Sequence, residues 1–206
     1  MIRTVERYAF LSGVLGLVAN ALLIALYVSF LPGLSSYSWT GPANDVIGGI
    51  VGSLAMIPVV LGLLQTVSAT PALVLAGRIA AAMLAAGALS SLLLVLEVIS
   101  FEVSVIVALP LIIALFAWFL VLGRTARLPG ALSRRARLVG MAGLAALPIG
   151  LLALIPIDPV RYAAGGLALL IGLPAYLYTP VWFIQLSNAY ATADEERVPA
   201  VMGEGR

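Results

Sequence analysis

Six apolar stretches, each about long enough to cross a lipid bilayer, dominate this sequence. The first covers 8–30, and Asn20 is its one strongly polar member. An α-helix needs roughly 20 apolar residues to cross the hydrocarbon core of a bilayer. The other five stretches are 46–64, 79–99, 103–123, 138–157 and 162–186. The sequence therefore predicts an all-α fold, a polytopic integral membrane bundle of six transmembrane helices.

Composition supports this prediction and limits the domain organisation. Of the 206 residues, 63% are hydrophobic and 10% are charged, whereas soluble domains have roughly 45–50% apolar and about 25% charged residues. The connections are too short to hold a separate soluble domain. We expect one six-helix domain over 1–186, followed by a polar cytoplasmic tail, 187–206, that is disordered.

The first apolar stretch is expected to stay in the protein as a membrane anchor. It is longer than the core of a signal peptide, which has roughly 7–15 apolar residues. No pattern of small residues typical of a cleavage site follows it near 31–33.

Arginine distribution predicts the orientation of the six spans. All 11 basic residues are arginines. Arg161 falls on one side, and the other side receives Arg3, Arg7, Arg78, Arg124, Arg127, Arg134, Arg135, Arg137, Arg197 and Arg206. Positively charged loops of membrane proteins stay in the cytoplasm. We therefore expect both termini to be cytoplasmic, in the inner (cytoplasmic) membrane of a bacterium. Trp118 and Trp182 would then lie in an interfacial aromatic belt near the cytoplasmic ends of their spans.

The residue types that are missing exclude several classes of chemistry. The chain has no Cys, His or Lys. Thiolate nucleophiles, imidazole metal ligands, a Ser-His-Asp triad and Schiff-base lysines are therefore impossible. The sequence also has no phosphate-binding glycine loop or metal motif. We expect no metal and no cofactor.

Small residues at four-residue spacing predict where the helices pack, because close backbone approach drives helix association in lipid. The expected packing faces are Gly48 and Gly52; Ala82, Ala86 and Ser90; and Ala164, Ala168 and Gly172. Thr70 and Pro71 are suited to cap and open the third helix. Pro58, Pro110, Pro148, Pro174 and Pro180 lie inside predicted spans and should kink them.

Two polar residues inside the apolar stretches are candidate site residues. Glu97 lies within an apolar run, where a charge is costly. It can be a proton- or cation-linked carboxylate that works beside Glu102, or a hydrated residue at the outer interface, which we favour. Asn20, near the middle of its span, can line a polar cavity or form a hydrogen bond between helices.

Other candidate residues lie at the outer side and in the last span. Asp45, Glu102, Asp158 and Arg161 can form an ion-pair cluster or the mouth of a cavity. The prolines of the last span are accompanied by Tyr176, Tyr178, Thr179 and Trp182. These side chains can bind a flat hydrophobic ligand such as a quinone or carotenoid, but an interfacial belt is the favoured interpretation.

Five arginines between the fourth and fifth spans form a candidate membrane-surface segment: Arg124, Arg127, Arg134, Arg135 and Arg137. Each is attracted to anionic lipid head groups by about 1 kcal/mol near the surface. No stacking aromatic residues accompany them, so we expect no nucleic-acid binding.

Several short motifs resemble those of small six-span membrane proteins of high-GC bacteria that carry only a domain-of-unknown-function label. These motifs are the run 11–26, the turn 101–103, the loop 132–138 and the ending Pro180-Val181-Trp182. The resemblance implies the six-span fold. It implies no activity, substrate or cofactor.

Three functions are compatible with these features. We favour a non-catalytic integral membrane protein, either an accessory subunit of a membrane complex or a binder of a lipid or other hydrophobic ligand. A small transporter or channel with Glu97 as an intramembrane carboxylate is the alternative. An enzyme that acts on a lipid through Glu97 and Glu102 is the third. The expected partners are the lipid bilayer and other membrane subunits.

Overall fold

The computed structural model of the protein describes residues 2–29, 39–152 and 157–195, and this part of the chain consists of helices joined by short connections, without strands. Its elements are α1 (Ile2–Ser29), α2 (Thr40–Asn44), η1 (Asp45–Gly52), α3 (Ser53–Thr66), α4 (Pro71–Val95), α5 (Phe101–Thr125), α6 (Leu132–Leu152) and α7 (Asp158–Glu195). The elements α2, η1 and α3 form one continuous rod, in which η1 is a π-helix.

Six of these helices are long and apolar enough to cross a membrane, counting α2, η1 and α3 as one. The predicted number and order of long apolar helices is thus confirmed for the described residues. The third helix also begins as predicted. Thr70 accepts a hydrogen bond of 3.3 Å from the backbone N–H of Leu73, and Pro71 occupies the first helical position, where its missing N–H costs nothing.

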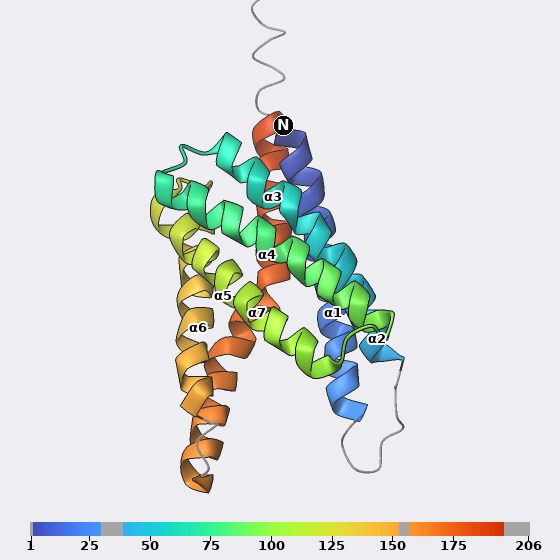
Figure 1. Ribbon diagram of the computed structural model, residues 1–206. Coiled ribbons are helices and arrows are strands. Elements are labelled where there is room, and N and C mark those ends of the chain that lie inside the picture. Colours follow the sequence, from blue (N-terminus) through green and yellow to red (C-terminus); the bar gives the residue numbers. More distant parts are fainter. Residues whose placement is uncertain (1, 30–38, 153–156, 196–206) are drawn as a thin grey trace, which may run out of the picture.

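The helices form a bundle that is tight at one end and forked at the other (Figure 1). Helix α7 packs along α6 in its first part and along α1 in its later part, and α3 lies between α1 and α4. Helix α5 starts beside the end of α4 and crosses to α6. At the forked end, α6 and the start of α7 therefore make one lobe, while α1, η1, α4 and the start of α5 make the other.

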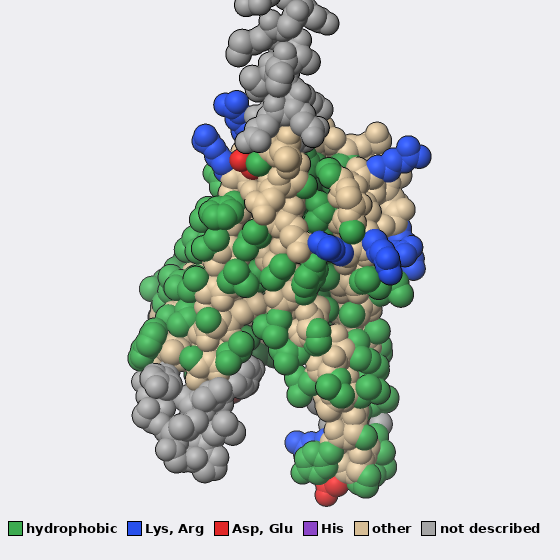
Figure 2. Space-filling view, turned by 180° about the vertical axis from the view of Figure 1, so that it is seen from behind, with side chains coloured by type: hydrophobic (Ala, Val, Ile, Leu, Met, Phe, Trp, Pro, Cys, Tyr) green, Lys and Arg blue, Asp and Glu red, His purple; other side chains and the backbone are tan. Residues whose placement is uncertain are grey.

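Arginine side chains gather at the tight end, which we call the arginine end (Figure 2). Helices α1, α4 and α6 begin there, and α3, α5 and α7 end there. Of the nine arginines in the described residues, Arg161 is at the forked end, and the others are Arg3, Arg7, Arg78, Arg124, Arg127, Arg134, Arg135 and Arg137.

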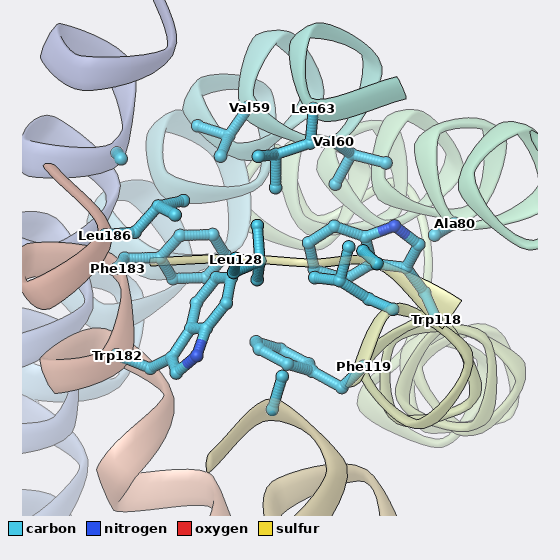
Figure 3. Packing of buried hydrophobic residues seen from close by; sticks show 14 of the residues in the cluster. Val59, Val60, Leu63, Ala80, Trp118, Phe119, Leu128, Trp182, Phe183 and Leu186 are labelled. Carbon is cyan, nitrogen blue, oxygen red and sulfur yellow. The ribbon is translucent and has the colours of Figure 1, made fainter. Parts of the chain in front are cut away.

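An aromatic core fills the arginine half of the bundle (Figure 3). Trp118 and Phe119 of α5 meet Trp182 and Phe183 of α7, and all four side chains are fully buried. The rings of Phe119 and Trp182 pack edge to face with centroids 4.9 Å apart, a geometry favoured by the quadrupoles of aromatic rings. Leu63 of α3 is fully buried in the same cluster.

Two sequence predictions about this region are wrong. Trp118 and Trp182 were expected in an interfacial belt, but neither side chain has any exposed surface. Both point into the bundle because α5 and α7 face each other here. The polar tail was expected from residue 187, but α7 continues to Glu195. Ser187 and Tyr190 are buried on this extension, and the Tyr190 hydroxyl lies 3.1 Å from Thr66 Oγ1. The remainder of the predicted tail, 196–206, lies outside the described residues.

Glycine contacts identify the tightest helix seams. Gly123 on α5 and Gly140 on α6 bring the two backbones together, since a Cβ atom added at Gly140 would lie 2.7 Å from the carbonyl oxygen of Phe116. The predicted seam of the last span also exists, because Gly172 packs against Ala146 of α6. The predicted face of the third span is partly wrong. Ser90 is buried, but Ala82 is exposed.

Candidate functional site

A glycine-rich π-helix shapes the centre of the larger lobe at the forked end. Gly48 packs against Ala19 of α1, and Gly49 packs against the side chain of Ser91 of α4. Larger residues at these positions would push the neighbouring helices apart. Each π-turn is wider than an α-turn, and such turns are frequent at functional sites. The Gly48 and Gly49 contacts therefore hold an irregular segment of helix between α1 and α4.

Beside this segment lies a cavity of about 250 Å³, which we call the central cavity. One water molecule needs roughly 10–15 Å³ on the same measure. Residues of α1, α2, η1, α3, α4, α5 and α7 line it. Its apolar wall comes mainly from α5, with Leu111, Ile112, Leu115 and Phe116. The size and the apolar wall suit an organic ligand rather than a few waters.

The central cavity lies where the two lobes of the bundle diverge. On its arginine side, α1 and α7 touch closely, because a Cβ atom added at Gly16 would lie 2.7 Å from Pro180 Cγ and one at Gly13 would lie 2.8 Å from the Pro180 carbonyl oxygen. Gly16 and Pro180 also line the cavity. Beyond this contact the lobes separate, and Figure 2 shows an open notch between them at the lower end.

Polar groups line another part of the central cavity. They are the amides of Asn20 and Asn44, the carboxylate of Asp45 and the hydroxyls of Ser53, Ser91, Tyr176 and Thr179. Thr179 donates a hydrogen bond of 2.9 Å to the carbonyl oxygen of Ala175 on its own helix. A smaller cavity of about 50 Å³ adjoins at Gly49 and Ser53. There Ser90 Oγ donates a hydrogen bond of 3.4 Å to Ser104 Oγ.

Asn20 and Asp45 are two of the polar groups here that have no described hydrogen-bond partner. The side chain of Asn20 is 7% exposed, and within the described residues its amide has no hydrogen-bond partner. Asp45 is half-buried, and its carboxylate has no ion pair or hydrogen bond with any described side chain. A buried polar group without a partner costs free energy. Both groups thus have bonding capacity directed at the cavity.

The structure brings together some of the predicted site residues and separates others. Asn20, Asp45 and Tyr176 line the central cavity. Glu102 is exposed in the first turn of α5. Tyr178 instead donates a hydrogen bond of 2.8 Å to Gln185 Oε1. Trp182 belongs to the aromatic core, where its Nε1 donates a hydrogen bond of 3.1 Å to the carbonyl oxygen of Leu132.

Glu97 is placed in a helix-ending turn rather than inside a span. Helix α4 ends at Val95, and Glu97 follows with a φ of 57° and an exposed side chain. Its backbone N–H donates to the Leu94 carbonyl oxygen at 2.9 Å, and that of Val98 donates to Leu93 at 2.8 Å. These two bonds define a Schellman motif, which needs a left-handed residue at the position of Glu97. The span predicted to end at residue 99 therefore ends earlier.

The five arginines of the membrane-surface segment are exposed around a compact turn at the arginine end. Ser133 fixes this turn, because its Oγ accepts a hydrogen bond of 2.9 Å from the Leu128 N–H and donates one of 2.9 Å to the Ala126 carbonyl oxygen. Arg135 donates to Gln185 Oε1 at 2.6 Å. A surface groove of about 370 Å³ runs between Gly130 and Thr192 beside this pair.

Sequence reasoning missed several residues of the central cavity. Gly49, Ser91 and the wall residues of α5 gave no signal of a site, since small and aliphatic residues occur throughout every span. Gly48 and Gly52 were predicted only as packing residues. The described residues contain no group of three or more acidic side chains that could hold a metal ion. No known protein family, curated protein or solved structure matches this chain.

Proposed function

We propose that this chain is a non-catalytic membrane protein that binds a lipid or another long-chain hydrophobic molecule in the central cavity. The observation that carries the proposal is the cavity itself, with an apolar wall on α5 and a few polar groups beside η1. Ligand sites commonly combine mostly apolar walls with a few polar groups that fix orientation. An amphiphile has the same division between chain and head group.

The position of the cavity supports a hydrophobic ligand that enters from the bilayer. We infer that the notch leads to the cavity, because Gly16 and Pro180, where α1 and α7 touch, both line the cavity. Leu169 and Leu170 on the α7 lobe are largely exposed, as expected for side chains that face lipid tails. A lipid chain in the notch could therefore reach the cavity without crossing water.

The packing of the arginine half favours a binder over the transporter or channel. The aromatic core of Trp118, Phe119, Trp182 and Phe183 lies between the cavity and the arginine end, and these side chains are fully buried. The cavity is thus accessible from one half of the bundle. Glu97, which motivated the transporter hypothesis, is an exposed turn residue outside the cavity.

The proposed orientation places the arginine end in the cytoplasm of a bacterium. Its support is the gathering of eight of the nine described arginines at that end, together with the tendency of positively charged segments to stay inside. The exposed arginines between α5 and α6 would then contact anionic head groups of the inner leaflet. The forked end with Asp45 and the notch would face the outer leaflet.

Native mass spectrometry of the full chain released from membranes tests the proposal. Ala108 lines both cavities, so Ala108→Phe should fill the space. Ala82→Phe is the matched control, since Ala82 is exposed on α4. Wild type and the control should carry the same bound molecule, and Ala108→Phe should lack it. Identical spectra for all three proteins would contradict a ligand in the central cavity.

A further inference from the structure

We infer that the central cavity selects a ligand with a cationic ammonium head group, held by Asp45 with Asn20 and Asn44. This inference rests on the proposed function and adds the chemistry of the head group. Its basis is the charge and the unused bonding capacity of the groups around η1. The hydrocarbon chain of the ligand would lie along α5 and toward the notch.

Asp45 is the source of negative charge in the cavity. Among the described residues that line the cavity, it is the one carboxylic acid, and no arginine accompanies it. A carboxylate within a membrane-spanning helix is costly unless a cation or hydrogen-bond donors compensate for it. The described side chains provide no such partner. A cationic ligand would supply the missing charge.

The two asparagines add acceptors of the kind that an ammonium group needs. An ammonium group has up to three N–H donors. The Asn44 Oδ1 lies against Gly48, 3.6 Å from the position of an added Cβ atom, and Gly48 in turn touches Ala19, the neighbour of Asn20. This contact places Asn44 beside the part of α1 that carries Asn20, a buried amide without a described partner. Asp45, which carries the carboxylate, is the residue after Asn44.

Two glycines allow η1 to lie close to α1 and α4. Gly48 and Gly49 leave the surface of η1 without side chains, so the main chain comes close to α1 and α4. A bulkier segment would fill the space between Asn20 and Asp45. The π-helix thus combines a bare surface with acidic and amide groups at its start.

The size of the cavity favours an organic cation over an inorganic one. A bound metal ion needs several oxygen ligands in a tight shell, whereas the polar groups here border a space of about 250 Å³. Much of that space is lined by aliphatic side chains and Phe116, and an alkyl chain would fill it.

Thermal unfolding of the full chain in neutral maltoside micelles tests the inference, because a ligand that binds the folded state raises the midpoint with its concentration. The probes are dodecylammonium chloride, 1-dodecanol and sodium chloride. Asp45→Asn removes the charge at nearly constant shape. Asp158→Asn is the matched control, an exposed carboxylate at the same forked end.

For wild type and Asp158→Asn, dodecylammonium should raise the midpoint at lower concentrations than dodecanol does. Asp45→Asn should need roughly tenfold more dodecylammonium, the loss expected for one charge-assisted contact, and its response to dodecanol should not change. Asn20→Ala should weaken the dodecylammonium response by a smaller factor, and it serves as the second variant if Asp45→Asn does not fold.

Three results would overturn the inference, and they separate it from the proposed function. Equal dodecylammonium responses in wild type and Asp45→Asn, with dodecanol still bound, would reject the head group while the hydrophobic site stands. A response of wild type to sodium chloride alone that Asp45→Asn abolishes would assign the carboxylate to an inorganic cation. No response to either amphiphile would reject the proposed function itself.

Discussion

Gly48 of η1 lies directly against Ala19 of α1, so that a Cβ atom added at Gly48 would stand 2.7 Å from the Ala19 Cβ. This contact fixes the π-helix against the helix that carries Asn20. Both Gly48 and Ala19 line the central cavity.

Gly48→Ala should destabilise the protein, because neither backbone can move without disturbing α4 on the other side. Overpacking of this kind costs about 1–3 kcal/mol. Gly166→Ala is the control, since Gly166 is exposed and has no neighbour within 4 Å of an added Cβ atom. Alanine is the better helix former, so this control should be neutral or slightly stabilising. The unfolding midpoints of the two variants in detergent measure these effects on stability. Equal effects of the two substitutions would contradict the close contact.

Trp182→Phe should cost more stability than Trp118→Phe. Both indoles are fully buried in the aromatic core, so the two substitutions remove similar packing. The Trp182 Nε1 donates a hydrogen bond to Leu132, whereas within the described residues the Trp118 Nε1 has no partner. The difference in the free energy of unfolding should be about 1 kcal/mol, the net contribution of one hydrogen bond. A larger loss for Trp118→Phe would argue against this arrangement of the core.

Glu97→Gly should stabilise the protein. Glu97 has a left-handed backbone conformation at the end of α4, which costs a residue with a Cβ atom roughly 1–2 kcal/mol relative to glycine. Glu102→Gly, in the first turn of α5, should instead destabilise by roughly 0.5–1 kcal/mol. Opposite shifts of the unfolding midpoint are thus expected. Destabilisation by both substitutions would indicate that Glu97 makes contacts that the Schellman motif does not explain.

Cysteine labelling should distinguish the two ends of the bundle. The sequence has no cysteine, so Val98→Cys and Ala131→Cys each introduce a single thiol in an exposed turn, at the forked end and the arginine end respectively. A membrane-impermeant maleimide should label Val98→Cys on intact cells and Ala131→Cys only after the membrane is opened. The reverse pattern would contradict the proposed orientation.

The number and order of the helices could be predicted from the sequence, because the bilayer requires long apolar runs and the connections break them. The start of α4 could be predicted as well, since Thr70 and Pro71 are a local capping pair whose geometry needs no distant contact. Arginine counting anticipated which helix ends lie together in the bundle. These are features that neighbouring residues determine.

The faces of the helices could not be predicted reliably, because lipid-facing and core-facing positions are both apolar. Trp182 illustrates the difficulty, since the sequence placed it at an interface and the structure places it in the core. Ala82 was expected in a packing face and is exposed. Which apolar side chains face the core depends on how the helices cross, as α5 does between α4 and α6.

The candidate site was predicted in part. Asn20 was a candidate because an amide is unusual in an apolar span, and it lines the central cavity. Asp45 was grouped with other outer carboxylates, but the π-helix turns it toward the cavity while Glu97 and Glu102 remain exposed. A change from α- to π-helical pitch depends on contacts with α1 and α4, so the local sequence did not reveal it.

The most direct measurement of the central claim is an experimental structure of the full chain in nanodiscs made from native lipid extract. The account predicts elongated density in the central cavity, with its polar end beside Asp45 and its chain along Leu111 and Leu115 of α5. A cavity closed by movement of α7 against η1, or one that contains ordered water alone, would contradict the account.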